Sequence, residues 1–213
     1  MTEKNDSREA ARESGGALFE RYNNRDVFDL IREHPLAWVS PRDGDPMNSA
    51  SLPLLAETDG DGRVCTLVGH MARRNPLFHT LSEKPHALIL FMGPQAYVSP
   101  AYVTDPAWAP SWNYAQARIE ATVRFEPDAT DEVLRMLLEA MEHHVPSGWT
   151  PANMGARYPR MQQSIIAFRA QVTNLRARFK LGQDEKPERL REILTRHPDQ
   201  SLVSWMRRFN ADR

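Results

Sequence analysis

Val64-Cys-Thr-Leu-Val-Gly-His-Met-Ala-Arg-Arg-Asn-Pro76 is the stretch of this chain that most constrains its fold. Residues 64–68 are apolar and rich in β-branched side chains, which predicts a buried strand. Beyond the turn, Leu77, Phe78 and Leu81 have helical spacing. Because free backbone N–H groups point outward where a helix begins, such a turn often holds an anion or a cofactor. A solvated basic turn is the alternative.

The side chains of this turn are the first candidates for a site. His70 lies beside two arginines, whose charges should lower its pKa and leave a neutral imidazole that can ligate a metal. Arg73 and Arg74 could hold phosphate or carboxylate groups. Asn75 could bind a ligand or cap the helix. A purely structural histidine is the alternative for His70, and His79, in the short helix, is the second choice as metal ligand.

Composition describes an ordinary globular chain of 213 residues with 41% hydrophobic residues and a net charge of −1. This charge provides no general attraction to nucleic acid, and no apolar run approaches the length of a membrane span, so we expect a cytoplasmic protein. The lone Cys65 cannot form an internal disulfide and is expected to be buried and inert. We expect a disordered tail over residues 1–16, one cofactor-binding domain over 17–196, and a helical extension over 197–213.

Short strands with turn signals, interrupted by a few helices, predict a β-rich α+β fold built on a compact barrel. Apolar periodicity and turn residues place the strands at residues 36–40, 47–55, 63–69, 86–92, 95–98, 113–125 and 164–172. The strand at 86–92 is almost wholly apolar, so burial on both faces is expected. Besides the short helix after the turn, helices are expected at residues 25–33, 130–144, 187–196 and 200–209.

Three further segments accompany the turn: Gln95-Ala-Tyr-Val-Ser-Pro-Ala-Tyr102, Pro110-Ser-Trp-Asn-Tyr114 and Arg178-Phe-Lys-Leu-Gly-Gln183. In this order and spacing, the four motifs resemble the PaiB family of FMN-binding transcriptional regulators. The resemblance covers roughly residues 26–194. It implies a split β-barrel of the flavin-reductase type, with peripheral helices. It also implies a homodimer that binds its cofactor at the subunit interface.

The resemblance implies roles for residues outside the turn. Cofactor contacts are expected from His70, Arg73, Arg74 and Asn75 of the turn. Outside the turn they are expected from Tyr97, Ser99, Trp112, Asn113, Lys180 and Gln183. Tyr114 is expected to be catalytic together with His70. The aromatic residues suit the wall around a flat ring system, although packing in a dimer interface explains them equally well. For Lys180 and Gln183 the alternative is a solvated strand end.

The chain also departs from the family pattern beside these motifs. Arg118 stands where a histidine is frequent, and Gly182-Gln-Asp replaces the usual Ser-Gln-Asn. This pattern resembles a haem-dependent branch, the piperazate synthases, which close N5-hydroxyornithine through an N–N bond. The resemblance therefore implies haem b with a small-molecule substrate, and His70 as the axial ligand. The alternative is an FMN-binding regulator or a flavin-dependent oxidoreductase, although the near-neutral charge argues against direct nucleic-acid binding.

Overall fold

The computed structural model describes residues 17–142, 145 and 148–212. The expected disordered tail, residues 1–16, lies outside these described residues, as do His143 and His144 at the end of a predicted helix. No helix within the described ranges is long and apolar enough to cross a membrane.

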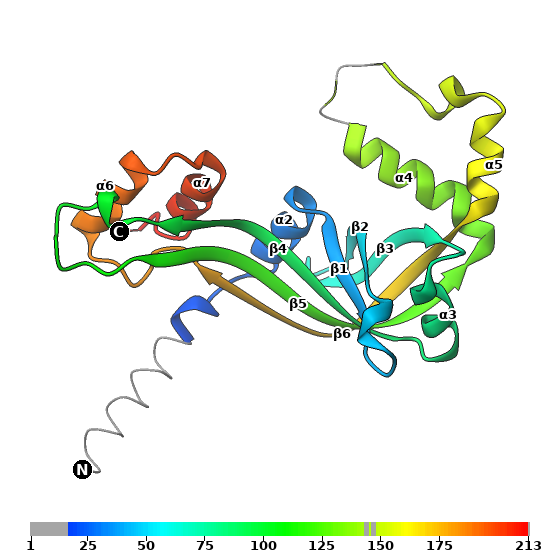
Figure 1. Cartoon of the computed structure of the whole chain (residues 1–213), viewed down its shortest axis with the longest axis horizontal. Helices are drawn as coiled ribbons and strands as arrows, with labels where there is room; N and C mark the ends of the chain where they lie inside the picture. The colour runs from blue at the N-terminus through cyan, green and yellow to red at the C-terminus, as the bar shows by residue number, and fades with distance from the viewer. Residues whose placement is uncertain (1–16, 143–144, 146–147, 213) are drawn as a thin grey trace, which may run out of the picture. The chain divides into compact units, whose positions relative to one another are not determined.

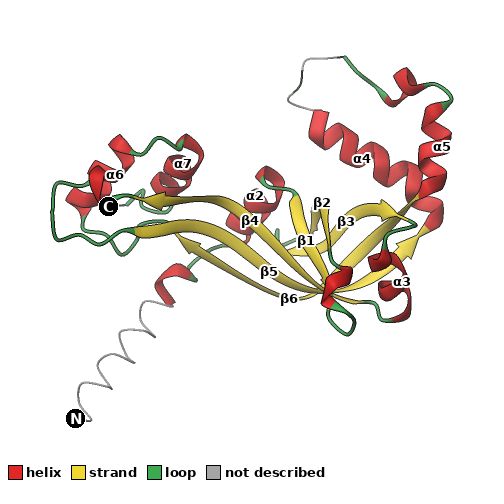
Figure 2. Ribbon diagram, viewed as in Figure 1, coloured by secondary structure: helices red, strands yellow, loops and turns green. Residues whose placement is uncertain are grey.

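The expected β-barrel is confirmed (Figure 1, Figure 2). Its strands are β1 (Leu36–Pro41), β2 (Ala50–Thr58), β3 (Val64–Ala72), β4 (His86–Val98), β5 (Ser111–Glu126) and β6 (Ile165–Lys180). They close in the order β1-β2-β3-β6-β5-β4. The helices are α2 (Asn24–Glu33), α3 (Pro76–Glu83), α4 (Thr130–Glu142), α5 (Arg157–Ser164), α6 (Pro187–Arg196) and α7 (Gln200–Arg208). Short 3-10 turns begin at Pro46, Pro100, Pro127 and Pro151.

Three expectations about the strands were wrong. The strands predicted at 86–92 and 95–98 are one continuous strand, β4. Its first half is not buried on both faces, because exposed and buried residues alternate and Leu88 is 45% exposed. The last strand does not end near residue 172 but runs to Lys180. Its second half is polar and alternates in burial, a pattern that an apolar-run criterion misses.

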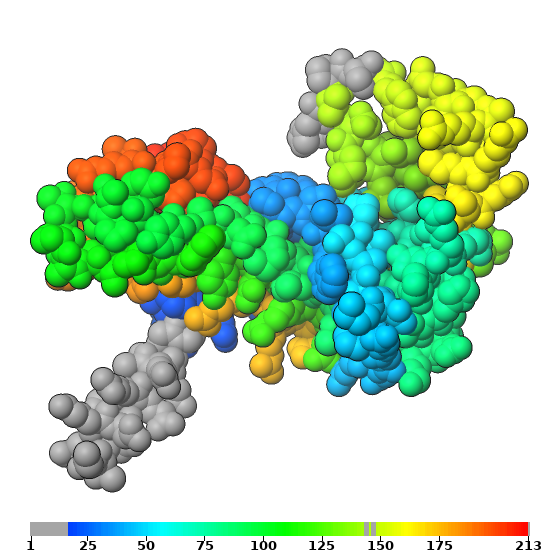
Figure 3. Space-filling model, viewed as in Figure 1, coloured from blue at the N-terminus to red at the C-terminus, as the bar shows by residue number. Residues whose placement is uncertain are grey.

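The chain divides into two compact units (Figure 3). Among the described residues, the first comprises 17–23, 92–117 and 176–212, and the second comprises 24–91, 118–142, 145 and 148–175. The division cuts through β4, β5 and β6, so each of these long strands contributes to both units. The predicted domain boundary between residues 196 and 197 stays a prediction.

In the second unit, strand register places one set of apolar side chains on the inner face of the barrel. Leu54 pairs with Gly69, and Gly69 pairs with Phe168. Val39 pairs with Ile89 in the same way. Because paired residues of antiparallel strands point to the same face, these side chains meet inside the barrel, where all are buried.

Helix α4 covers part of the outer face of the barrel in this unit. Val133 and Leu137 of α4 form a buried cluster with Val68 of β3 and Ala167 of β6. Helix α5, which the sequence analysis did not predict, joins α4 through Asp131, which accepts hydrogen bonds from Tyr158 and Gln162. Helix α5 then leads directly into β6.

The first unit has its own aromatic core. The ring of Phe179 on β6 stacks on Trp205 of α7 and on Phe209, with centroids 5.8 and 4.7 Å apart. The buried side-chain amide of Asn210 donates hydrogen bonds to the carbonyl oxygen atoms of Leu181 and Met206 and so links the segment after β6 to α7. Helix α7 therefore packs against the end of β6 within this unit.

Candidate functional site

Alternation along β3 sends Gly69 and His70 to opposite faces of the barrel. A Cβ atom on Gly69 would overlap with Leu54 Cδ2 and would lie 3.1 Å from Phe168 Cζ, so the interior requires glycine at this position. His70 consequently points to the outer face, where it pairs in register with Ala167. In the Gly69-His70 pair, the glycine is therefore required by packing inside the barrel, and the histidine side chain lies on the outer face.

His70 is half-buried, and its Nδ1 atom is fully buried without a hydrogen-bond partner among the described residues. Burial lowers the pKa of the His70 imidazole below its usual value of 6.5. The direction agrees with the expectation, but the expected cause was wrong, because desolvation and not the neighbouring arginines lowers it. A neutral imidazole can ligate a metal or haem iron, and here only Nε2 could do so, since Nδ1 is buried.

The rest of the turn divides into structural and free groups. Asn75 caps α3 as expected, since its side-chain oxygen accepts a hydrogen bond from Leu77 N at 3.0 Å. Arg73 and Arg74 are exposed, and neither side chain forms an ion pair or hydrogen bond with any residue that the structure describes. His79 is exposed on α3, and its ring lies 5.3 Å from that of Phe78. Both free cations therefore remain available to an acidic ligand.

The sequence analysis missed an apolar surface on the same outer face as His70. Leu36 and Trp38 of β1 are 62% and 51% exposed. Leu36 pairs with Pro53, which lies beside His70 because Leu54 pairs with Gly69. Since adjacent strands are about 4.8 Å apart, the Leu36 backbone lies about 10 Å from that of His70. In residues 36–39 every second side chain is large, apolar and exposed, and the side chains between them are buried. This alternation in the sequence could have indicated the apolar surface.

Part of this outer face is covered and part is open. Helix α4 covers Val68 and Ala167 on one side of His70, while Leu36 and Trp38 on the other side are more than half exposed. Leu88 of β4, which pairs with Ser40 of β1, extends the open part. His70 therefore lies at the boundary between the covered and the open surface.

The other predicted residues belong to the first unit. Tyr97 and Trp112 are exposed and their rings meet edge to face, with centroids 6.0 Å apart. Lys180 donates a hydrogen bond to the hydroxyl of Ser111 at the start of β5. Tyr114 is partly buried on β5. These groups form an aromatic and cationic surface of the kind expected for a planar anionic ligand.

Three predicted cofactor-binding residues make structural contacts in the first unit. Ser99 accepts a hydrogen bond from Ala101 N and caps a 3-10 turn. Asn113 is buried with its amide 3.5 Å from the sulfur of Met206. Gln183 bonds to the backbone of Leu181 and Phe179 within its own turn. A ligand contact at these positions stays a prediction.

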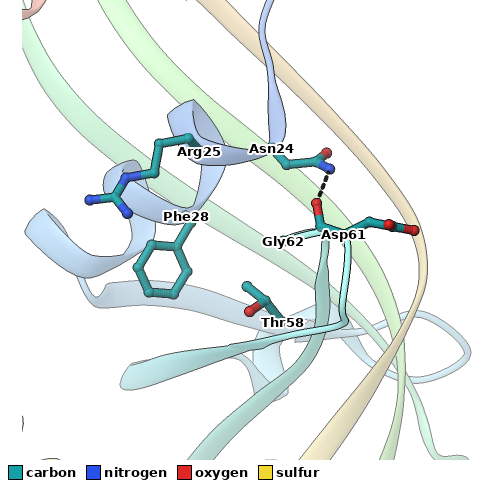
Figure 4. A pocket seen from close by; sticks show the side chains of 6 residues that line it. All are labelled: Asn24, Arg25, Phe28, Thr58, Asp61 and Gly62. Atoms are coloured by element: carbon teal, nitrogen blue, oxygen red, sulfur yellow. Dashed lines mark hydrogen bonds between the residues drawn. The ribbon is translucent and has the colours of Figure 1, made fainter.

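A concave surface lies in the second unit between the start of α2 and the turn that joins β2 to β3 (Figure 4). It has a volume of about 290 Å³ and is lined by Asn24, Arg25, Phe28, Thr58, Asp61 and Gly62. The Asn24 amide donates to the Asp61 carbonyl oxygen at 3.1 Å. None of these residues was predicted to bind a ligand.

Cys65 is partly exposed and not buried as expected. Its Sγ atom lies 3.5 Å from the carbonyl oxygen of Glu57 on the paired strand. Cys65 lies near the start of β3, which is paired with β2 and β6, and the Thr66 hydroxyl lies 3.8 Å from its Sγ atom. Among the described residues, no group of three or more histidine, cysteine, aspartate or glutamate side chains could hold a bare metal ion.

Residues 17–174 match the sequence profile described as "Putative FMN-binding domain". The chain therefore belongs to this FMN-binding family. Among named relatives, the protease synthase and sporulation protein PAI 2 of Bacillus subtilis (strain 168) is 27% identical over 172 residues, which cover 78% of this chain and 80% of the relative. The match confirms the PaiB-like resemblance.

Solved structures show the same fold at low sequence identity. The FAD and haem binding protein of Mycobacterium smegmatis superposes with a TM-score of 0.55 and 20% identity, covering 76% of this chain and 73% of that one. The flavocytochrome Anf3 of Azotobacter vinelandii gives a TM-score of 0.56 and 16% identity, covering 76% and 69%. These likenesses support the split-barrel class.

Proposed function

We propose that this chain is a haem-dependent enzyme resembling piperazate synthase, which forms an intramolecular N–N bond in N5-hydroxyornithine during natural-product biosynthesis. The observation that carries the proposal is the half-buried His70, whose Nδ1 atom lacks a partner and whose pKa is lowered by burial. Two unpaired arginines follow it in the same turn. Structures of the same fold include an FAD and haem binding protein, so the fold is compatible with haem as well as with flavin.

In this proposal haem b, when bound, supplies a Lewis-acidic iron that activates the N–O bond of the hydroxylamine. His70 would hold the iron as a neutral imidazole, while Arg73 and Arg74 would hold the propionate carboxylates of the haem. Ring closure forms the N–N bond and breaks the N–O bond, and the hydroxyl leaves as water with a proton from the attacking amine. The overall change therefore needs no external oxidant or reductant. Tyr114 is the second proposed catalytic residue, because its phenol can donate and accept a proton.

The visible spectrum of the purified protein, reconstituted with ferric haem, tests this proposal. A Soret band that shifts in His70→Ala, with native circular dichroism and loss of ring closure, is the expected result. His79→Ala is the control, because His79 is exposed on α3 and should leave the spectrum nearly unchanged. If the two variants exchange these effects, His79 is the ligand. If neither changes the spectrum, His70 does not hold iron.

FMN is the second candidate cofactor, and the family description favours it. In this case the chain is a PaiB-type regulator or a flavin-dependent oxidoreductase, and Arg73 and Arg74 hold the phosphate of FMN. Paired near-ultraviolet and blue absorption bands without a Soret band would establish this alternative. Repression of a reporter gene, rather than turnover, would then distinguish the regulator from the oxidoreductase.

We also propose a homodimer formed through the open apolar face of β1 and β4. Leu36, Trp38 and Leu88 are large, exposed and on one face, and a single copy leaves them in water. A dimer mass in light scattering at micromolar concentration is expected, and Trp38→Lys should shift it towards the monomer. A wild-type monomer under these conditions would refute the proposal.

The surface of the first unit is tested independently of His70. On this unit alone, Tyr97, Trp112 and Lys180 are proposed to contact the ring and an acidic group of a planar ligand. Charge reversal of Lys180 should cost roughly 1.5–3 kcal/mol of cofactor binding if it makes a charge-assisted hydrogen bond. Unchanged affinity in both Lys180→Glu and Trp112→Ala would remove this surface from the proposed site.

A further inference from the structure

The arginines of the second unit fall into two groups. Of the twelve arginines that the structure describes there, seven form ion pairs: Arg25, Arg32, Arg42, Arg63, Arg124, Arg135 and Arg169. The other five are exposed and have no ion pair or side-chain hydrogen bond with a described residue: Arg73, Arg74, Arg118, Arg157 and Arg160. Pairing is thus the rule in this unit, and the exceptions need an explanation.

Four of the five unpaired arginines belong to two segments that meet at one point. Arg73 N donates a hydrogen bond of 2.9 Å to the carbonyl oxygen of Ser164, the last residue of α5. Ala72 also pairs with Ile165 at the start of β6. Arg160 lies four residues before Ser164 on α5, which is about 6 Å along the helix axis. The basic turn therefore lies beside the C-terminal end of α5, and Arg160 is about one helical turn from this contact.

Contacts on a different side of α5 hold the helix in place. Tyr158 and Gln162, one turn apart, both donate hydrogen bonds to Asp131 of α4. Arg157 and Arg160 are three residues apart and share another stripe of the helix, which is exposed to solvent. The helix is thus anchored by its polar uncharged residues, while its two arginines remain free.

We propose that Arg73, Arg74, Arg157 and Arg160 form one anion-binding surface beside His70, and that it takes a small ligand with at least two negative charges. Four neighbouring cations repel one another, and within the described residues nothing neutralises them, although the whole chain has a net charge of −1. Guanidinium groups bind carboxylate and phosphate in the same bidentate manner. The inference rests on the proposed function, because the acidic groups of the cofactor are taken to be the ligand of this surface. It adds Arg157 and Arg160 of α5 to the two arginines that the proposed function already uses.

Arg160→Glu tests the inference, and Arg118→Glu is its matched control. Both residues are exposed and unpaired in the same unit, but Arg118 lies on β5, outside the two segments. Ferric haem, titrated by its Soret band, and FMN, titrated by its fluorescence, report dicarboxylate and phosphate binding respectively. For whichever ligand binds the wild type, Arg160→Glu should reduce the affinity roughly tenfold to a hundredfold, and Arg118→Glu should reduce it by less than about twofold. Neither variant should lower the melting temperature without ligand, since neither arginine has a partner among the described residues to lose.

Pyrophosphate provides a readout that requires neither cofactor. It should raise the melting temperature of wild-type protein and of Arg118→Glu, and this increase should be lost in Arg160→Glu. If Arg160→Glu behaves like Arg118→Glu while Arg73→Glu weakens binding, the surface ends at the turn, and the inference is overturned with the proposed function intact. If neither haem nor FMN binds the wild type, the proposed function fails, and pyrophosphate still decides the inference. If pyrophosphate has no effect and Arg160→Glu abolishes binding of a short random duplex DNA, the surface is for nucleic acid and the inference is overturned.

Discussion

Gly69→Ala should destabilise the protein although it adds only one methyl group. The new Cβ atom would overlap with Leu54 Cδ2, and it would lie 3.1 Å from Phe168 Cζ and 3.2 Å from the carbonyl oxygen of Pro53. Leu54 and Phe168 are fully buried, and the Pro53 oxygen belongs to the paired strand, so none of the three can retreat freely. Overpacking of this kind costs about 1–3 kcal/mol, from which the gain of replacing a strand glycine, about 0.5–1 kcal/mol, is subtracted.

The net expectation is a loss of about 1 kcal/mol in the free energy of unfolding, which corresponds to about 2–4 °C in melting temperature for a chain of this size. Urea unfolding followed by circular dichroism measures the loss directly. Gly60→Ala is the control, because a Cβ atom there meets nothing within 4 Å. A Gly69→Ala protein as stable as the Gly60→Ala protein would refute the argument that interior packing requires glycine before His70.

Further predictions concern other residues of the same unit. Because burial lowers the pKa of His70, the unfolded chain binds more protons there than the folded protein. Cofactor-free protein should therefore lose stability as the pH falls through about 6.5, and His70→Gln should flatten this part of the curve in urea unfolding at several pH values. Asn75→Ala should cost about 1 kcal/mol in the same measurement through loss of the α3 cap. Cys65→Ala should retain bound cofactor in the visible spectrum, because the thiol is hydrogen-bonded to the backbone of Glu57 and to the neighbouring Thr66; loss of cofactor from a folded variant would contradict this.

The site could be predicted in part from local patterns. Asn75 and Pro76 stand in the order that begins a helix, and the helix begins there. The neutral state of His70 was also predicted, but from adjacent charges, whereas burial on the folded barrel is the actual cause. Desolvation depends on neighbours such as α4 that are distant in sequence, so a local pattern cannot report it. For Gln183 the local motif predicted a cofactor contact, but its side chain forms hydrogen bonds with the backbone of its own turn.

Periodicity and turn chemistry by themselves determined most strands and helices, because the preference for alternating or helical burial is encoded over a few neighbouring residues. The bounds of α6, residues 187–196, follow from its proline and its apolar spacing. Only the tertiary structure decided which faces meet. Strand register aligned Leu36, Pro53 and His70 in one row, and a hydrogen bond between Arg73 and Ser164 brought two pairs of arginines together from segments more than eighty residues apart. Such neighbours arise from pairing between distant strands, and no local sequence pattern contains the register of that pairing.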